Sequence, residues 1–269
     1  MTIKKLFART LQATRLELRQ RWWQLRNACG WRERWDGTET LNVVLLSYRR
    51  MENLRYIVDS LLLCDFVERI VLSNNNPAVR MEQFVSSRDS RLQIINQPRR
   101  CYPSIRYQLA RQLSGQYFLA IDDDLFLTPR QIHKLFQRLL EHPSVPHGAA
   151  AEDIEVRDGK IVSRNVSWGK TRETDVILWA YAFTRQHLHR YFTLLNRLGM
   201  SEDEVKTSED VIISFTGDGR PYCEDLGTLF CCDSATDAAI ATWMQEGFLQ
   251  ERGRLYLSCR ECLATEPWR

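Results

Sequence analysis

Residues 117–124 read Tyr-Phe-Leu-Ala-Ile-Asp-Asp-Asp, a short apolar run that ends in three consecutive aspartates. Such a run is typical of a strand that is buried on both faces of a sheet. Similar apolar runs precede it at residues 41–46, 68–72 and 92–95. We therefore expect four strands that belong to one sheet.

Segments with helical periodicity follow these runs, at residues 51–64, 104–113 and 129–142. Strands that alternate with helices form right-handed βαβ units and a mainly parallel sheet. The predicted fold class is therefore α/β, with a Rossmann-like sheet flanked by helices.

The pattern is looser after Gly148. A hairpin is expected to turn at residues 158–159, followed by a strand at 175–183 and a helix at 185–198. A further helix is expected to open at Ser208, which would be its N-cap, with acidic residues in the first turn. We find no internal repeat, so we predict one α/β domain over residues 36–269.

Composition places the chain among ordinary globular proteins. Of its 269 residues, 44% are hydrophobic and 26% are charged, which excludes wholesale disorder. No stretch reaches the roughly 18 consecutive apolar residues that a membrane-spanning helix requires. We expect a cytoplasmic protein with reduced thiols, because the opening residues do not resemble a signal peptide.

The net charge of +3 is unevenly distributed. Residues 1–35 contain nine basic and two acidic residues, a formal charge of +7, which leaves residues 36–269 at −4. A general nucleic-acid binder is therefore excluded as the main interpretation.

The basic segment, residues 1–35, is predicted to be an amphipathic helical extension. Its apolar residues recur at helical spacing, and arginine and lysine occupy much of the remaining surface. Two alternatives stay open: the helix binds an anionic membrane surface, or it packs on the main domain. The apolar residues are Ile3, Phe7, Leu11, Leu18, Trp22 and Leu25.

Eight cysteines are present, and Cys259 and Cys262 have CxxC spacing. A zinc site usually needs a second well-spaced pair or histidine partners, and no histidine follows His189. Buried or incidental thiols are the favoured interpretation, and the role of this pair is left open.

Polar residues follow each of the four expected strands. In a parallel α/β sheet, ligands bind beyond the carboxyl ends of the strands. Amides and arginines suit a nucleotide, and carboxylates suit Mn²⁺ or Mg²⁺. The residues expected to contact the nucleotide are Ser47, Tyr48, Arg49, Asn74, Asn75, Asn96, Asp122 and Asp123.

The three aspartates at 122–124 have a simpler interpretation as a solvated turn. Their position argues against it, because like charges at the mouth of a buried strand repel one another unless a cation neutralises them. We therefore predict a metal site.

Four motifs occur in an order that resembles a GT-A glycosyltransferase, and more narrowly the catalytic domain of exostosin-type N-acetylhexosaminyltransferases. This resemblance implies a UDP-sugar donor, Mn²⁺ and retention of the anomeric configuration. It also implies that Asp124 binds the metal directly and that Asp122 contacts the metal or the donor sugar. The motifs lie at residues 43–50, 69–76, 119–124 and 208–215.

By the same resemblance, Asp210 would lie near the reacting carbon or the acceptor hydroxyl, with Glu209 beside it. Inverting GT-A enzymes also use a Glu-Asp pair here, with the aspartate as base, so both stereochemical outcomes stay open. The simpler interpretation of this pair is a helix start whose charge complements the helix dipole.

Several further roles are predicted with alternatives. A basic residue should stabilise the departing nucleoside diphosphate. Trp179 and Tyr181 would form an aromatic platform for a sugar ring, or belong to the core. The candidate basic residues are Arg49, Arg50, Arg254 and Arg260.

The sequence thus predicts a metal-dependent glycosyltransferase, with a nucleotide-sugar half over about 41–128 and an acceptor half over about 145–269. The acceptor would be a glycan or a lipid-linked glycan at the inner face of the cell membrane. The alternatives are a sugar nucleotidyltransferase and a non-catalytic protein that binds a membrane surface. Against the former, residues 47–51 lack the glycine-rich loop that such enzymes usually carry.

Overall fold

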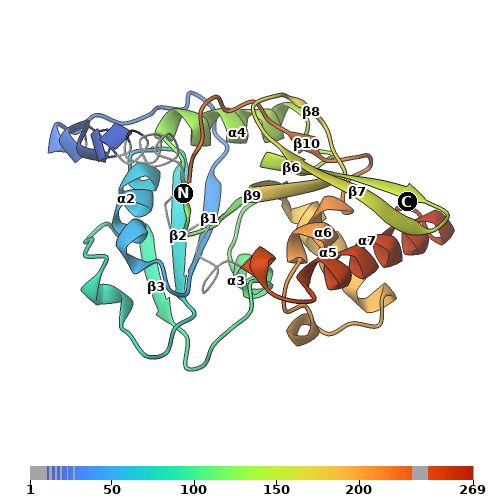
Figure 1. Cartoon of the computed structure of the whole chain (residues 1–269). Coiled ribbons are helices and arrows are strands. Elements are labelled where there is room, and N and C mark those ends of the chain that lie inside the picture. The colour runs from blue at the N-terminus through green and yellow to red at the C-terminus, as the bar shows by residue number, and fades with distance from the viewer. Residues whose placement is uncertain are drawn as a thin grey trace.

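The computed structural model describes residues 11–231 and 242–268, apart from residues 12, 13, 16, 19, 23 and 27. One large sheet crosses the molecule, and helices lie on both of its faces (Figure 1). The α/β class predicted from the sequence is confirmed, with a mainly parallel central sheet.

The first half of the sheet is parallel. Its strands are β1 (Leu41–Ser47), β2 (Val67–Asn74), β3 (Leu92–Asn96) and β4 (Tyr117–Ile121), in the order β3-β2-β1-β4. The helices of this half are α2 (Met51–Leu62), α3 (Ile105–Gln112) and α4 (Pro129–Glu141). Each element lies within a few residues of its predicted position.

The second half extends the sheet with antiparallel pairs. Strand β9 pairs antiparallel with β4 and with β6, and β6 pairs antiparallel with β7, so the hairpin predicted at residues 158–159 is present. Short strands β10 and β8 complete this edge, while β5 pairs with β11 in a separate ladder. The strand bounds are β5 (Leu125–Phe126), β6 (His147–Arg157), β7 (Lys160–Ser167), β8 (Arg172–Glu173), β9 (Val176–Thr184), β10 (Tyr222–Cys223) and β11 (Phe230–Cys231).

Three α-helices cover this half, namely α5 (Arg185–Arg197), α6 (Glu209–Ser214) and α7 (Phe248–Thr265). Single turns of 3-10 helix occur at Met81–Gln83, Glu202–Glu204 and Thr242–Met244. Threonine caps begin α4 and α5. The Thr184 hydroxyl accepts a hydrogen bond from the His187 N–H, and the His187 ring nitrogen accepts one from the Thr184 N–H.

The core has two layers because successive side chains of a strand point to opposite faces. Val43 and Leu45 of β1 pack with α2 and α4, whereas Val44 and Leu46 pack with α3, α5, α6 and α7. Burial on both faces explains why the strand reads as a continuous apolar run.

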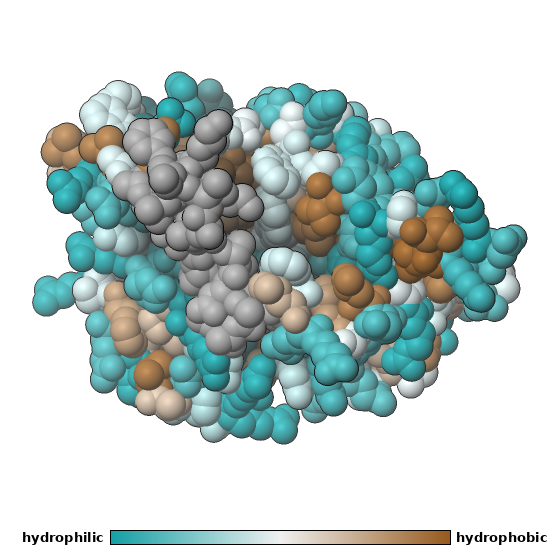
Figure 2. Space-filling view, viewed as in Figure 1, coloured by the Kyte–Doolittle hydropathy of each residue, from teal (hydrophilic) through white to brown (hydrophobic). Residues whose placement is uncertain are grey.

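The described residues between 11 and 28 are helical, in agreement with the predicted extension. Its described apolar side chains Leu11, Leu18, Trp22 and Leu25 are exposed, whereas Ile3 and Phe7 lie outside the described residues. Figure 2 shows hydrophobic surface at the upper left, where the blue helix lies in Figure 1. No helix in the described part of the chain is both long enough and apolar enough to span a bilayer.

One predicted cap is wrong. Ser208 precedes α6, but its backbone is left-handed (φ 65°), and its side chain makes no capping hydrogen bond. A side-chain cap normally requires an extended backbone at this position, which Ser208 does not have.

Candidate functional site

The ends of the parallel strands lie in one row. Ser47 is paired with Asn74, and Asn74 with Asn96, at the ends of β1, β2 and β3. Strand β4 pairs with β1 up to Ile121, so the aspartates leave the sheet at the same edge. The topology therefore brings together residues that are 75 positions apart in the chain.

Asp123 holds the loop after β1. Its carboxylate accepts hydrogen bonds from the Tyr48 N–H (3.3 Å) and from Arg50 Nη1 (3.0 Å). Its carbonyl oxygen accepts one from Asn53 Nδ2 (2.8 Å). Asp123 is buried, and these contacts give it a structural role beside the donor-binding role predicted from the sequence.

The predicted asparagines bond mainly to one another and to their own loops. Asn74 Nδ2 donates to Asn96 Oδ1 (2.9 Å), and Asn96 Nδ2 donates to Glu82. Asn75 accepts a hydrogen bond from the Ser73 hydroxyl (2.8 Å). Ser47 is buried, and its hydroxyl faces Met51 Sδ. Direct contact between these side chains and a nucleotide stays a prediction.

Tyr48 offers a different binding surface. The Arg49 guanidinium lies 5.1 Å from the centre of its ring, and that of Arg100 lies 4.6 Å away. Both arginines are exposed, so two positive charges flank one aromatic ring at the strand ends. The sequence interpretation missed Arg100, although it follows β3 and could have been found by the same rule as the other strand-end residues.

Asp122 and Asp124 are each paired with an arginine. Arg50 Nη1 lies 3.0 Å from Asp124 Oδ2, and Arg106 Nη2 lies 2.7 Å from Asp122 Oδ1. Burial, reinforced by the charge of Asp122, raises the pKa of Asp124 to about 7 despite the neighbouring Arg50.

Arg106 joins the aspartates to α6. This arginine is 4% exposed, and its Nε lies 3.4 Å from Glu209 Oε1. Burial raises the pKa of Glu209 to about 7, opposed by Arg106 and reinforced by Asp210. The prediction from sequence missed Arg106. Its position three and four residues before the buried Leu109 and Ala110, on the apolar face of α3, was the available signal.

Asp210 also has a buried cationic partner. Arg252 Nη1 lies 2.6 Å from Asp210 Oδ1, and Arg252 Nε lies 2.6 Å from Glu152 Oε2. Glu152 contacts a second arginine, Arg164, at 3.0 Å. The structure thus brings the predicted Glu209–Asp210 pair close to the aspartate cluster through buried ion pairs.

Arg252 was missed by the sequence interpretation, which named Arg254 and Arg260 on the same segment. Those two arginines are exposed, whereas Arg252 is 3% exposed. Arg252 lies on the same face of α7 as the buried Leu255 and Tyr256, three and four residues later.

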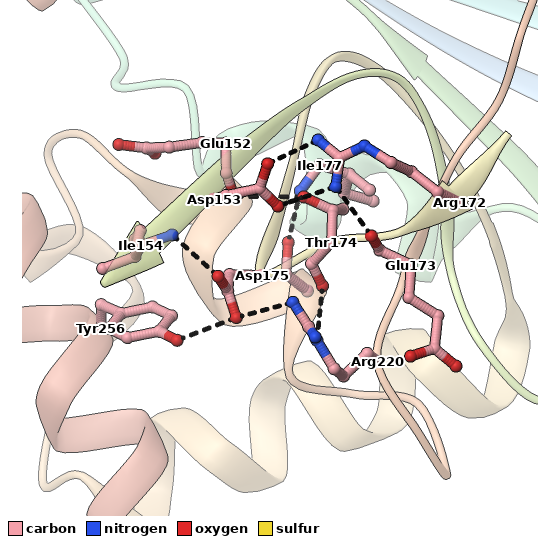
Figure 3. A network of polar contacts seen from close by, with 11 residues as sticks. Glu152, Asp153, Ile154, Arg172, Glu173, Thr174, Asp175, Ile177, Arg220 and Tyr256 are labelled. Atoms are coloured by element: carbon pink, nitrogen blue, oxygen red, sulfur yellow. Dashed lines mark hydrogen bonds and ion pairs between the residues drawn. The ribbon is translucent and has the colours of Figure 1, made fainter. Parts of the chain in front are cut away.

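A network of polar contacts anchors α7 next to this site (Figure 3). Asp175 accepts hydrogen bonds from the Ile154 N–H (2.7 Å) and the Tyr256 hydroxyl (3.1 Å), and it pairs with Arg220 (3.1 Å). Because Tyr256 lies one helical turn after Arg252, this network fixes the helix that delivers Arg252 to Asp210.

A divalent cation fits the charge of this edge. Asp122, Asp123, Asp124 and Glu209 contribute four carboxylates, and the guanidiniums that contact them come from Arg50 and Arg106. The described residues include no cluster of three or more side chains already arranged as metal ligands. A cation here would therefore also need oxygen ligands from a bound substrate such as a diphosphate.

The remaining candidates lie in the core or beside the site. Tyr181 is buried, with the Arg106 guanidinium 5.3 Å from its ring centre, so it is not a platform for a sugar. Trp179 is half-buried. Cys259 is buried, and the seven described cysteines, Cys262 among them, form no disulfide with one another.

A parallel sheet with carboxylates and arginines at its carboxyl edge defines an α/β fold of the GT-A type, in which that edge receives a nucleotide. The chain belongs to glycosyl transferase family 2, whose family model matches residues 42–196. The match includes the strand ends and the aspartates but ends before Glu209. Sequence comparison with curated proteins finds no significant match.

Solved structures resemble this fold at low sequence identity. GalNAc-T7 with UDP, GalNAc and Mn²⁺ aligns with a TM-score of 0.52 and 9% identity, over 74% of this chain and 45% of that one. A CMP:2-keto-3-deoxy-manno-octonic acid synthetase with CTP aligns with a TM-score of 0.40 and 11% identity, over 58% of this chain and 78% of that one. The former likeness supports the fold alone, and the latter carries no argument.

Proposed function

We propose that this glycosyltransferase is metal-dependent and moves a sugar from a UDP-sugar to a glycan or lipid-linked acceptor. The most specific form of the proposal is that the sugar is an N-acetylhexosamine. The observation that carries the proposal is the surplus of carboxylate at the edge where a GT-A sheet receives its nucleotide. There Asp122, Asp123, Asp124 and Glu209 face only the guanidiniums of Arg50 and Arg106 among their ion-pair partners in the described residues. The exostosin-type resemblance is the source of the N-acetylhexosamine expectation. In this proposal residues 41–128 form the donor half and residues 145–269 the acceptor half.

Asp122 and Asp124 would hold Mn²⁺ or Mg²⁺ together with diphosphate oxygens. The cation, when bound, supplies charge that stabilises the departing nucleoside diphosphate. Arg49 and Arg100 are exposed beside Tyr48 and can contact the nucleotide at the same edge. Arg50 is committed to Asp123 and Asp124, so its contribution is to hold these carboxylates in place.

Asp210 is the proposed group that acts on the acceptor. Its Oδ1 accepts hydrogen bonds from Arg252 Nη1 and from the Val211 N–H. Its Oδ2 is then the oxygen that accepts the proton of the acceptor hydroxyl as that oxygen bonds to the anomeric carbon and the nucleoside diphosphate leaves. This step describes the inverting alternative; under the retention that the exostosin-type resemblance implies, the same carboxylate would instead position the acceptor.

The proposed acceptor lies at the inner face of the cell membrane. The helix before residue 30 exposes Leu18, Trp22 and Leu25 together with Arg15 and Arg21, a combination that binds anionic lipid surfaces. A peripheral location of this kind would present lipid-linked glycans to the site.

A thermal-shift screen tests the donor assignment. The full-length protein is heated with UDP-glucose, UDP-galactose, UDP-N-acetylglucosamine or UDP-N-acetylgalactosamine, each with Mn²⁺ or with EDTA. Because a ligand that binds the native state raises the midpoint of unfolding, at least one donor should raise it with Mn²⁺ and not with EDTA. No shift with any donor would contradict the proposal.

Product analysis separates the transferase from its alternatives. A glycosyltransferase releases UDP from the donor, whereas a sugar nucleotidyltransferase releases pyrophosphate from a nucleoside triphosphate. A non-catalytic binding protein would release neither.

A further inference from the structure

Strand β9 contains a bulge at Trp179. Gly148 of β6 pairs with Tyr181, but Ala150, two residues later, pairs with Leu178, so β9 has one extra residue in this interval. Trp179 lies within it and has a left-handed backbone (φ 71°). Such a conformation strains a bulky residue, and bulges beside active sites redirect side chains.

The bulge is attached directly to the candidate metal cluster. The Trp179 carbonyl oxygen accepts a hydrogen bond from the Asp122 N–H at 3.1 Å. This contact places the strained residue at the point where β4 ends and the aspartates begin.

A second tryptophan extends the aromatic surface. The rings of Trp168 and Trp179 are 5.3 Å apart between centroids and inclined at 46°. Trp168 follows β7 and is 53% exposed. Trp179 of β9 and Trp168, which directly follows β7, therefore meet beside the site, and Trp168 is open to solvent.

We propose that Trp168 and Trp179 form the binding subsite for a pyranose ring of the acceptor glycan, an inference that rests on the proposed function. The C–H face of a pyranose is apolar, and an aromatic ring covers it while the hydroxyl groups remain solvated. The pair lies on the half of the sheet formed by β6, β7 and β9, on the far side of Asp122 from Tyr48 and Arg49. The acceptor would thus approach the aspartates from the side opposite the nucleotide.

Two substitutions test the subsite with little change to the backbone. Trp168→Ala removes an exposed side chain, and Trp179→Gly places at φ 71° the residue that best tolerates a left-handed conformation. Trp31→Ala is the matched control, because Trp31 is 58% exposed but packs on Arg26, next to the N-terminal helix.

The measurement is saturation-transfer NMR on the full-length protein with Mn²⁺ and UDP. The probes are the methyl β-glycosides of glucose, galactose and N-acetylglucosamine. In the wild type and in Trp31→Ala, at least one glycoside should receive magnetisation at its ring C–H protons. Trp168→Ala and Trp179→Gly should bind that glycoside about tenfold more weakly, which corresponds to about 1.4 kcal/mol.

UDP titration in the same samples separates this inference from the proposed function. If UDP binds but no glycoside gives a signal, or the signal is equal in all four proteins, the subsite is wrong and the transferase assignment stands. If UDP itself does not bind with Mn²⁺, the proposed function fails. If both tryptophan variants lose UDP binding together with the glycoside, they have disturbed the aspartate cluster, and a separate acceptor subsite is contradicted.

Discussion

Arg252 of α7 and Asp210 of α6, 42 positions apart in the chain, form a buried ion pair with 2.6 Å between Nη1 and Oδ1. The same guanidinium binds Glu152 through Nε. Desolvation of buried charges is costly, so such a pair is weak evidence for stability by itself. Because the pair lies at the proposed acceptor-activating carboxylate, we assign Arg252 a positioning role: it holds Asp210 in a fixed orientation.

Replacing Arg252 by lysine tests this positioning role. Lysine keeps the positive charge but cannot keep two directed contacts, so we expect kcat to fall by about 10- to 100-fold while the Kd for UDP changes less than threefold. Arg130→Lys, an exposed change on α4, should leave both values unchanged. A parallel loss of UDP affinity in Arg252→Lys would instead indicate a general structural role.

The substitution Asp210→Asn should lower kcat by about 10²–10⁴ and leave UDP affinity within threefold, because the carboxylate acts on the acceptor and not on the nucleotide. Steady-state kinetics of sugar transfer and UDP titration give the two values. Asp203→Asn, at an exposed acid, is the matched control. If Asp210→Asn keeps the wild-type kcat, the role of Asp210 is only to complement the helix dipole.

Protonation of His187 is expected to lower the free energy of unfolding in acid. Burial lowers its pKa to about 4, and its Nδ1 accepts the Thr184 N–H, a bond that protonation removes. The unfolded chain, with a histidine pKa of about 6.5, binds more protons between about pH 4 and 6.5, so the native state loses stability as the pH falls through that window. At pH 5 the loss amounts to about 2 kcal/mol.

His187→Gln isolates this effect, because glutamine completes the same cap in α4 without titrating. Urea unfolding of both proteins at pH 7 and pH 5 cancels the contributions of the other groups. The wild type should lose about 2 kcal/mol more than the variant over this interval. Equal losses would show that His187 is not the group responsible.

The repeating pattern of the chain was sufficient to predict the sheet, the helices around it and the aspartates at its edge. Burial on both faces produces continuous apolar runs, and the carboxyl ends of such strands share one edge. The residues that complete the site were not predictable in this way. Arg106 and Arg252 meet carboxylates 16 to 103 positions away in the chain, Glu152 among them. Helical spacing shows which face of α3 or α7 is buried, but it carries no information about such distant partners.

Two local backbone conformations could also not be predicted from the pattern of residues in the sequence. Ser208 and Trp179 both have left-handed backbones, which neither residue type favours. Ser208 directly precedes α6, and Trp179 lies in the bulge of β9, so a rule based on residue type predicts an ordinary cap and an ordinary strand at these positions.

Because the N-terminal helix is basic and exposes apolar side chains, we expect the protein to bind anionic membranes in a salt-sensitive way. Each basic residue near such a surface contributes about 1 kcal/mol, and salt screens the attraction. Full-length protein should co-sediment with phosphatidylserine vesicles at low salt and not with phosphatidylcholine vesicles. A version that starts at Arg32 keeps the contacts of Glu33 and Trp35 with the main domain, and it should stay in the supernatant. No sedimentation of the full-length protein with anionic vesicles would contradict a membrane role.

The most direct test of the central claim is calorimetric titration of UDP into the full-length protein with Mn²⁺ and with EDTA. Asp124→Asn removes one carboxylate from a crowded cluster, so the variant should stay folded. Asp158→Asn, at an exposed turn with φ 48°, is the control, because asparagine tolerates this conformation. We predict Mn²⁺-dependent UDP binding in the wild type and in Asp158→Asn, and its loss in Asp124→Asn. Equal UDP binding with Mn²⁺ and EDTA, or wild-type binding by Asp124→Asn, would contradict the account.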